Sequence, residues 1–388
     1  MLTRIGLVPS FGFGDRLGSA TPGHISAVRD THFVPIFAQQ SVRENARTGR
    51  TPQMVMDDAR RAVEDAGWDA PWGADADHLK TVDDLPPFVA AGYTFYTVDP
   101  GAYVNNEADD ADPAVLYKML AARMDWDELS SIYLQKSTMP GLTPFDESHL
   151  LRAVVKYGQA ILYTISMFKR LSELRDAFDF EVSVDETDSP TTPLEHFFIA
   201  NELTRYGVAF TSLAPRFIGR FEKGVDYIGD LEKLDIELAK HAAVTTHFGT
   251  YKISLHSGSD KFSVYPLLAR HWGERIHVKT AGTSYLEALR TFAGTEPDLF
   301  KKIWLLGLER YPTDRATYHV SAEPGKVPPV DDLRDYLDDF HAREILHVTF
   351  GSALARYGAE IRAALARHNE IYQVNLQRHF TKHLDLLK

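Results

Sequence analysis

The chain contains no cysteine among its 388 residues. This absence excludes disulfide bonds, thiolate nucleophiles, iron–sulfur clusters and cysteine-ligated zinc. Any metal ion that the protein binds must therefore be held by histidine, aspartate, glutamate or carbonyl oxygens.

Long apolar runs and an excess of basic charge are absent as well. No uninterrupted apolar stretch reaches the ~18 residues of a membrane-spanning helix, and residues 1–4 lead into a strand-like run rather than into an apolar leader segment. The 42 basic and 54 acidic side chains give a net charge of −12, which argues against nucleic acid or an anionic membrane as a partner. We therefore expect a cytoplasmic protein that acts on a small molecule. The sequence leaves its oligomeric state open.

Nucleotide-binding motifs are also missing. The glycine-rich segment 11–18, FGFGDRLG, lacks the GK[ST] ending of a phosphate loop, and no GxGxxG follows a predicted strand. We interpret residues 1–32 as an N-terminal preface. Within it, Arg16 either belongs to a structured entry loop or grips an anionic substrate, because a guanidinium binds a carboxylate through two parallel hydrogen bonds.

The segments that are present alternate between strand-like and helical patterns. Eight strand-like runs can be counted, each followed by a helical stretch, over residues 33–38, 93–98, 180–185, 207–213, 252–257, 276–280, 317–321 and 346–350. Eight such units predict a (β/α)₈ TIM barrel. We predict a single domain over 1–388 with helical insertions, of which about 100–150 is the main one.

Polar residues recur at the C-terminal ends of these strands, where α/β barrels carry their active sites. Side chains alternate across a strand, so that the apolar set should face the helices and the polar set the barrel interior. This alternation predicts that five residues converge at the C-terminal mouth: Asp185, His256, Lys279, His319 and His347.

Imidazole and carboxylate groups at one mouth suit a divalent cation such as Zn²⁺, Mn²⁺ or Fe²⁺. We predict a metal site formed by Asp185 or Glu186 with His256, His319 and perhaps His347. The alternative is a hydrogen-bonded polar network without a metal. There is no HExxH motif, so the constellation itself carries the prediction.

Other polar residues near the predicted strand ends have open roles. Lys279 can be a Schiff-base nucleophile, a proton carrier or a fixed charge for a substrate anion, and a metal would favour the last two roles. Asp260 and Lys261 either contact the substrate, Asp260 as a catalytic group, or stabilise the next helix. Further predicted substrate contacts are Gln39, Ser257 and Arg216.

Four stretches resemble the tagaturonate epimerase (tagaturonate/fructuronate epimerase) family: SFGFGDRLG with TPGH at 10–24, SVDETDSPT at 183–191, SLHSGSDKFSVYP at 254–266 and HVKTAGTSYLEAL at 277–289. The resemblance implies a metal-dependent barrel that interconverts two acidic keto-sugars. It also implies that Asp185 and Glu186 form a proton-transfer and metal-ligand pair. His256 and His319 would then be further ligands.

The chemistry of such an inversion favours a retro-aldol route. The inverted carbon lies β to the ketone, so its C–H bond is not made acidic by enolisation. A base, Asp185 or Glu186, would remove the β-hydroxyl proton, the C–C bond would open to a metal-stabilised enediolate, and re-addition after rotation would give the epimer. Lys279, Arg16 or Arg216 would bind the carboxylate. A metal-dependent sugar-acid lyase and a non-catalytic sugar-acid binding protein remain the alternatives.

Overall fold

The computed structural model describes residues 1–120, 124–134, 139 and 141–388 of the chain. Eight parallel strands close into a barrel in sequence order, with β1 pairing back to β8. The strands are β1 (Ser10–Phe13), β2 (Val34–Ser41), β3 (Gly73–Leu79), β4 (Phe95–Val98), β5 (Asp179–Val184), β6 (Ser212–Pro215), β7 (Lys252–Leu255) and β8 (Ile276–Thr280). The predicted (β/α)₈ barrel is confirmed.

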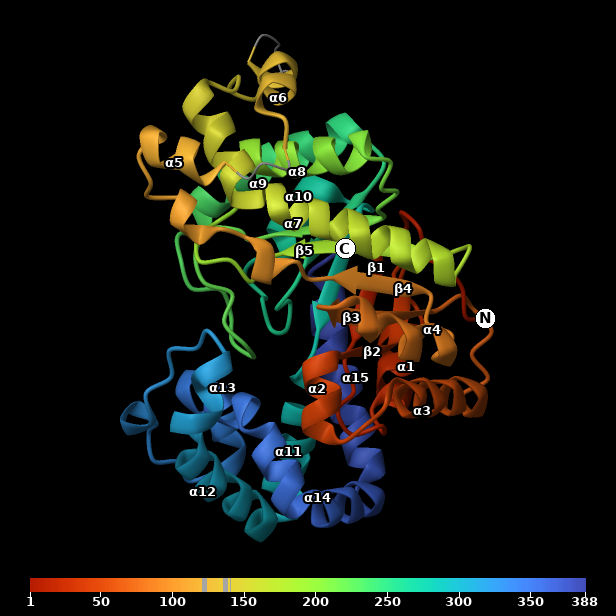
Figure 1. Cartoon of the computed structure of the whole chain (residues 1–388). Coiled ribbons are helices and arrows are strands. Elements are labelled where there is room, and N and C mark those ends of the chain that lie inside the picture. Colours follow the sequence, from red (N-terminus) through yellow and green to blue (C-terminus); the bar gives the residue numbers. More distant parts are fainter. Residues whose placement is uncertain (121–123, 135–138, 140) are drawn as a thin grey trace.

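Helices surround the barrel (Figure 1). They are α1 (Thr21–Val28), α2 (Val42–Thr48), α3 (Pro52–Asp65), α4 (Leu85–Ala91), α5 (Pro113–Met119), α6 (Trp126–Tyr133), α7 (Glu147–Leu174), α8 (Pro193–Arg205), α9 (Leu231–Phe248), α10 (Tyr265–Trp272), α11 (Thr283–Thr295), α12 (Pro297–Asp314), α13 (Phe340–Val348), α14 (Phe350–Arg367) and α15 (Asn369–Asp385). In Figure 1 the group α5–α9 lies at one end of the view and α11–α14 at the other, with the strands between them.

Local sequence explains where several helices begin. Ser41 ends β2 and caps α2, because its hydroxyl accepts the Glu44 N–H while the Glu44 side chain accepts the Ser41 N–H. Thr192 and Glu195 form the same reciprocal pair at the start of α8. Each cap fixes the residue at which its helix begins.

Two predicted strands, 317–321 and 346–350, are wrong. The second run spans the end of α13 and the start of α14, since a short apolar run fits a buried helix as well as a strand. The first is a 3₁₀ turn, Arg315–Thr317, followed by an irregular segment whose backbone N–H groups at Ser321 and Ala322 donate to carboxylates.

Two true strands were missed. β1 lies inside the segment interpreted as a preface and pairs with β8 through Ser10 and His277, so Gly12 belongs to the barrel and not to an entry loop. β3 carries aspartates, which are depleted in strands, and this hides its character in the sequence. The predicted insertion at about 100–150 corresponds to part of the long helical connection between β4 and β5 and includes the residues outside the description. The single-domain organisation stays a prediction.

None of the helices in the described part of the chain combines the length and the apolar character that a membrane crossing requires.

Candidate active site

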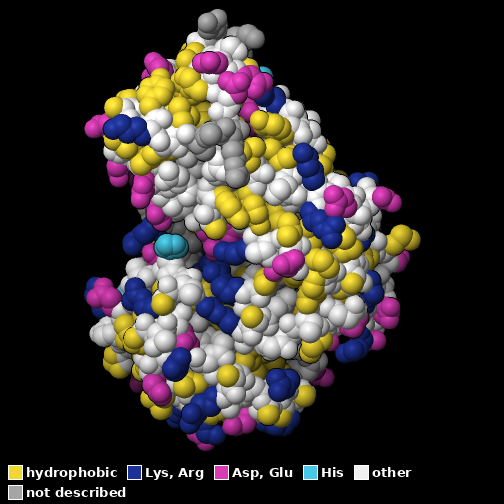
Figure 2. Space-filling model, in the orientation of Figure 1, with side chains coloured by type: hydrophobic (Ala, Val, Ile, Leu, Met, Phe, Trp, Pro, Cys, Tyr) yellow, Lys and Arg dark blue, Asp and Glu magenta, His cyan; other side chains and the backbone are white. Residues whose placement is uncertain are grey.

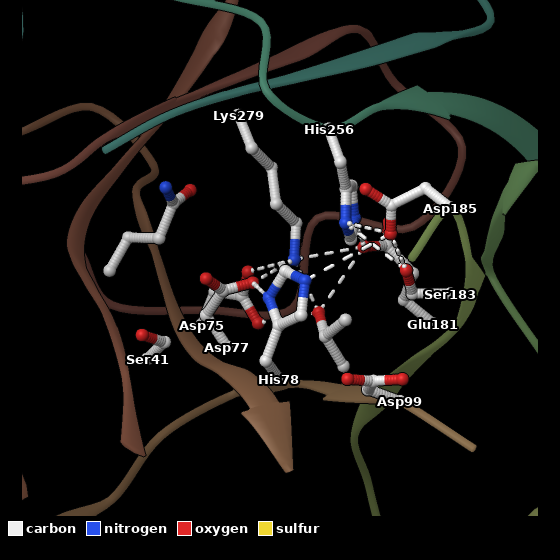
Figure 3. Close-up of polar contacts among 12 residues, drawn as sticks. Ser41, Asp75, Asp77, His78, Asp99, Glu181, Ser183, Asp185, His256 and Lys279 are labelled. Atoms are coloured by element: carbon white, nitrogen blue, oxygen red, sulfur yellow. Dashed lines mark hydrogen bonds and ion pairs between the residues drawn. The ribbon is translucent and has the colours of Figure 1, made fainter. Parts of the chain in front are cut away.

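Lys279 lies at the centre of a buried charge cluster inside the barrel (Figure 3). Its ammonium group is 2.5 Å from Asp75 and 2.9 Å from Asp77, both on β3, and 2.8 Å from Glu181 on β5. Burial alone would lower the pKa of Lys279, but the three carboxylates outweigh it and raise the pKa above its usual range. The lysine is therefore a fixed positive charge, which disfavours the Schiff-base role that the sequence left open.

A β-bulge turns two consecutive residues of β3 toward this cluster. Ala76 pairs with Tyr96 and Leu79 with Val98, so β3 has one residue more than β4 over the same length. His78, the extra residue, takes a left-handed backbone with φ of 53°, which few non-glycine residues adopt. Its ring Nδ1 consequently lies 2.9 Å from Asp77.

Three residues, one on a strand and two directly after strand ends, bring potential metal ligands together. One ligand atom each from His78, Asp185 and His256 lies within 4.8 Å of the others. Asp185 Oδ1 is 3.2 Å from His256 Nδ1 and 3.9 Å from His78 Nε2. The side chains come from β3 and from the residues directly after β5 and β7, and they face one another in Figure 3. We call these residues the His78 triad.

The triad lies in a strongly negative environment. Burial lowers the pKa of His256, but Asp185 and Glu181, the latter 2.6 Å away, raise it to about 10. Burial also opposes charge on His78, and Asp77 again prevails and raises its pKa. Asp185 stays ionised because His256 outweighs its burial and holds its pKa well below the usual range. The site thus attracts positive charge, and a divalent cation bound to the two imidazoles and Asp185 would take the place of their protons.

Of the residues predicted at the site, Asp185, His256 and Lys279 do converge at the strand ends. Glu186 follows Asp185 but lies outside the His78 triad: its carboxylate pairs with Arg43 at 3.3 Å and lies 3.7 Å from Lys80. Burial would raise the pKa of Glu186, but His78 and Arg43 lower it overall. Glu186 is therefore an ionised carboxylate beside the triad.

His319 and His347 are not at strand ends and belong to neither group of potential ligands found among the described residues. His319 is exposed in the irregular segment after α12, where it lines the same cavity as His256. His347 lies within α13, where burial and the nearby Arg16 guanidinium hold its pKa well below the usual value. Their predicted placement rested on the two strands that do not form.

Asp260 and Lys261 also differ from the prediction. Asp260 belongs to a second cluster, in which it pairs with Arg343 at 3.0 Å and with His379 at 2.5 Å. His383 completes that cluster and accepts the Asp260 N–H. Lys261 is fully buried and donates to three backbone carbonyls, so its ammonium is engaged with the protein. The structure places neither residue beside the His78 triad.

The predicted substrate contacts differ in whether their polar groups are already engaged within the protein. Arg16 is buried, pairs with Glu44 at 2.7 Å and stacks on the Phe350 ring, so its charge is already balanced. Gln39 lines a small inner cavity, where its Nε2 donates to the Thr280 carbonyl.

A larger cavity of about 370 Å³ opens above the triad. Ser257 lines both this cavity and the small inner one, and Arg216 lines the larger one together with Asp185, Glu186 and His256. In Figure 2 the surface is hollowed between the two helical groups, with Lys and Arg side chains gathered beside the hollow.

The sequence analysis did not predict several residues of the site: Asp75, Asp77 and His78 on β3, and Lys223 in the connection after β6. Glu181 lies four residues before Asp185 on the same side of its strand, so that alternation places it inward, but the sequence assigns it no role. The alternation of alanine and aspartate over 73–79, GADADHL, is the signal that would have identified β3. No comparable local signal marks Lys223.

A parallel barrel with a histidine and carboxylate cluster at the carboxyl ends of its strands is the arrangement of TIM-barrel enzymes. A model of the tagaturonate epimerase family matches residues 3–387. The tagaturonate/fructuronate epimerase of Thermotoga maritima is 44% identical over 401 residues, covering 99% of this chain and 82% of that protein. The chain belongs to the tagaturonate epimerase family, and since epimerases are isomerases, it is an enzyme of that class.

Solved structures agree with this assignment. The fructuronate-tagaturonate epimerase of Cohnella laeviribosi, crystallised with one glycerol, matches with a TM-score of 0.96 and 39% identity over 100% of this chain and 83% of that one. Its native crystal structure gives a TM-score of 0.95 with the same identity and coverage. A probable tagatose 6-phosphate kinase from Sinorhizobium meliloti, at a TM-score of 0.54 and 11% identity over 98% of this chain and 100% of that one, shares the fold alone.

Proposed function

We propose that this enzyme is a divalent-cation-dependent epimerase of a ketohexuronate such as D-tagaturonate or D-fructuronate, acting in the cytoplasm. The names of the similar proteins support the substrate class. The observation that carries the cation dependence is the His78 triad, which joins two imidazoles and a carboxylate beside a cavity large enough for a hexuronate.

The triad fits a divalent cation on its donor chemistry. Neutral imidazole and carboxylate are the ligands that Zn²⁺, Mn²⁺ and Fe²⁺ accept, and three protein ligands leave positions open for substrate. Such a cation would act as a Lewis acid that polarises the keto oxygen of the substrate. Glu181 orients His256, and Asp77 orients His78, through contacts of 2.6 and 2.9 Å, as carboxylates behind metal-bound histidines commonly do.

The sequence leaves open which of the two adjacent acids is the metal ligand and which is the base. Asp185 belongs to the triad, so it is the ligand, and Glu186 is the base. Glu186 remains ionised, lines the cavity and is held by Arg43. It would accept the proton of the β-hydroxyl group, and the electron pair of that O–H bond would form the new aldehyde carbonyl as the C–C bond opens. The electron pair of the C–C bond would pass to the ketone fragment, which becomes an enediolate.

The cavity must then hold both fragments. The aldehyde turns its other face to the carbon that it left, the C–C bond forms again, and Glu186 returns the proton to the new hydroxyl group. Atoms and charge balance, because the product is an isomer. Cations along the cavity, among them Arg216, would retain the fragment that carries the carboxylate.

The test combines metal content with activity. We expect about one transition-metal ion per chain by elemental analysis, and interconversion of tagaturonate and fructuronate by NMR that is lost on chelation and restored by the ion. Release of a three-carbon fragment or loss of water would replace the epimerase with a lyase. Full activity after complete removal of metal would refute the cation dependence.

A further inference from the structure

Lys223 is a cationic side chain that faces the substrate cavity without a carboxylate partner among the described residues. It lies in the connection between β6 and α9 and lines both cavities beside His256. Its ammonium donates to the Ser257 hydroxyl at 2.6 Å. By contrast, Arg43 in the same cavity pairs with Glu186.

Two buried cations hold the backbone on either side of Lys223. The Lys261 ammonium donates to the carbonyls of Glu222 at 2.7 Å and Val225 at 2.5 Å. The Arg343 Nε donates to the carbonyl of Gly224 at 2.7 Å. Three of the four carbonyls from 222 to 225 are thereby fixed by side chains from elsewhere in the fold.

The conformation of this segment requires glycine at position 224. Gly224 has a φ of +74°, and a Cβ atom there would lie 3.1 Å from the His347 ring. The tight turn lets the neighbouring carbonyls point inward to the buried cations while the Lys223 side chain extends into the cavity.

Three residues of the loop after β7 contribute to the position of Lys223. Ser257 holds the Lys223 ammonium, Asp260 pairs with Arg343 at 3.0 Å, and Lys261 holds the carbonyls. Burying charged groups is costly and adds little net stability compared with apolar packing. Fixing the position of the half-buried Lys223 ammonium explains why these charges are buried here.

We propose that Lys223 binds the carboxylate of the sugar acid and gives the enzyme its preference for acidic over neutral sugars. Ser257, Lys261 and Arg343 act through it as positioning residues. Arg43 is already paired, and Arg216 lines only the outer cavity, whereas Lys223 reaches both. The inference rests on the proposed function in taking a sugar acid as the substrate.

The first experiment compares an acidic and a neutral ligand. Binding of a non-reacting hexonate and of the corresponding hexitol is measured by calorimetry at saturating metal for wild type, Lys223→Met, Lys223→Arg and the surface control Lys302→Met, whose side chain is exposed on α12. We expect Lys223→Met to weaken hexonate binding about 10- to 100-fold, the loss typical of a charged hydrogen bond, and to leave hexitol binding unchanged. Lys223→Arg should recover part of the loss, and Lys302→Met should behave as wild type.

A double-mutant cycle tests the positioning role. Ser257→Ala should raise KM for the keto acid several-fold with kcat little changed, and should add nothing in the Lys223→Met background, because its effect passes through Lys223. Unchanged hexonate binding in Lys223→Met, or an additive effect of Ser257→Ala, would overturn the inference. Lys223-dependent hexonate binding by a wild-type protein that epimerises no ketohexuronate would refute the proposed function and leave this inference standing.

Discussion

Replacing Lys279 by methionine removes the one cation that three buried carboxylates share. The lysine side chain is 4% exposed, and those of Asp75, Asp77 and Glu181 are 0%, 8% and 0% exposed. Methionine fills a similar volume, so that the substitution tests charge more than packing.

The expected loss in the free energy of unfolding follows from the cost of leaving a buried charge without its partner. Removing one partner of a buried ion pair typically destabilises a protein by about 3–5 kcal/mol. We expect a loss of about 4 kcal/mol in the free energy of unfolding near pH 8, a large share of the roughly 5–15 kcal/mol that a folded protein has. For a chain of this length that loss corresponds to a decrease of about 5 °C in Tm. The difference from wild type should shrink toward pH 5.5, because the stranded carboxylates can then bind protons.

The assay is thermal and urea unfolding of Lys279→Met, the Lys302→Met control and wild type, all with chelator so that cation binding does not contribute. The control should change by less than about 1 kcal/mol, since its pair with Glu360 is exposed. Borohydride treatment with substrate should leave Lys279 unmodified by mass spectrometry. Wild-type stability in Lys279→Met, or a trapped adduct on Lys279, would show that the residue is not a fixed charge.

Two further predictions concern carboxylates, the first Asp185 and Glu186 at the site and the second Glu344 on α13. Glu186→Gln should keep the metal but lower kcat about 10²- to 10⁴-fold, whereas Asp185→Asn should lose metal; elemental analysis with kinetics separates them, and metal loss in Glu186→Gln would reverse the assignment. Burial and the adjacent Glu222 raise the pKa of Glu344 to about 8. The stability that its retained proton provides is complete below about pH 4.5 and lost as pH rises through 8. After allowance for solvent screening, Glu344→Gln should be about 1–2 kcal/mol more stable than wild type at pH 8 and equal to it at pH 4.5 in urea unfolding. Parallel pH profiles of the two proteins would contradict this.

Part of the site follows from the sequence by simple geometry. Side chains alternate along a strand and parallel strands end at one mouth, so Asp185, His256 and Lys279 could be placed together without any structure. The same reasoning placed Glu181 on the inner face of its strand, where it contacts both Lys279 and His256.

The rest depends on contacts that no local pattern records. β3 can bury Asp75 and Asp77 only because Lys279 arrives from a strand some 200 residues later in the chain. His78 faces the site only because of a bulge that interrupts the alternation. Asp260 and Lys261 follow the end of β7, where alternation no longer decides the direction of a side chain.

The closure of the barrel through β1 and β8 has a consequence for how the chain folds. Phe13 pairs beside Thr280, so the first strand stays an open edge until more than 260 further residues have been made. At roughly 5–20 residues per second, that wait is on the order of 10–50 s during synthesis. Pairings between strands this distant in the chain slow folding. Until β8 has paired with it, the open edge of β1 can form hydrogen bonds with other chains and so promote aggregation. We expect refolding yield, rather than final stability, to be the property most sensitive to substitutions in β1.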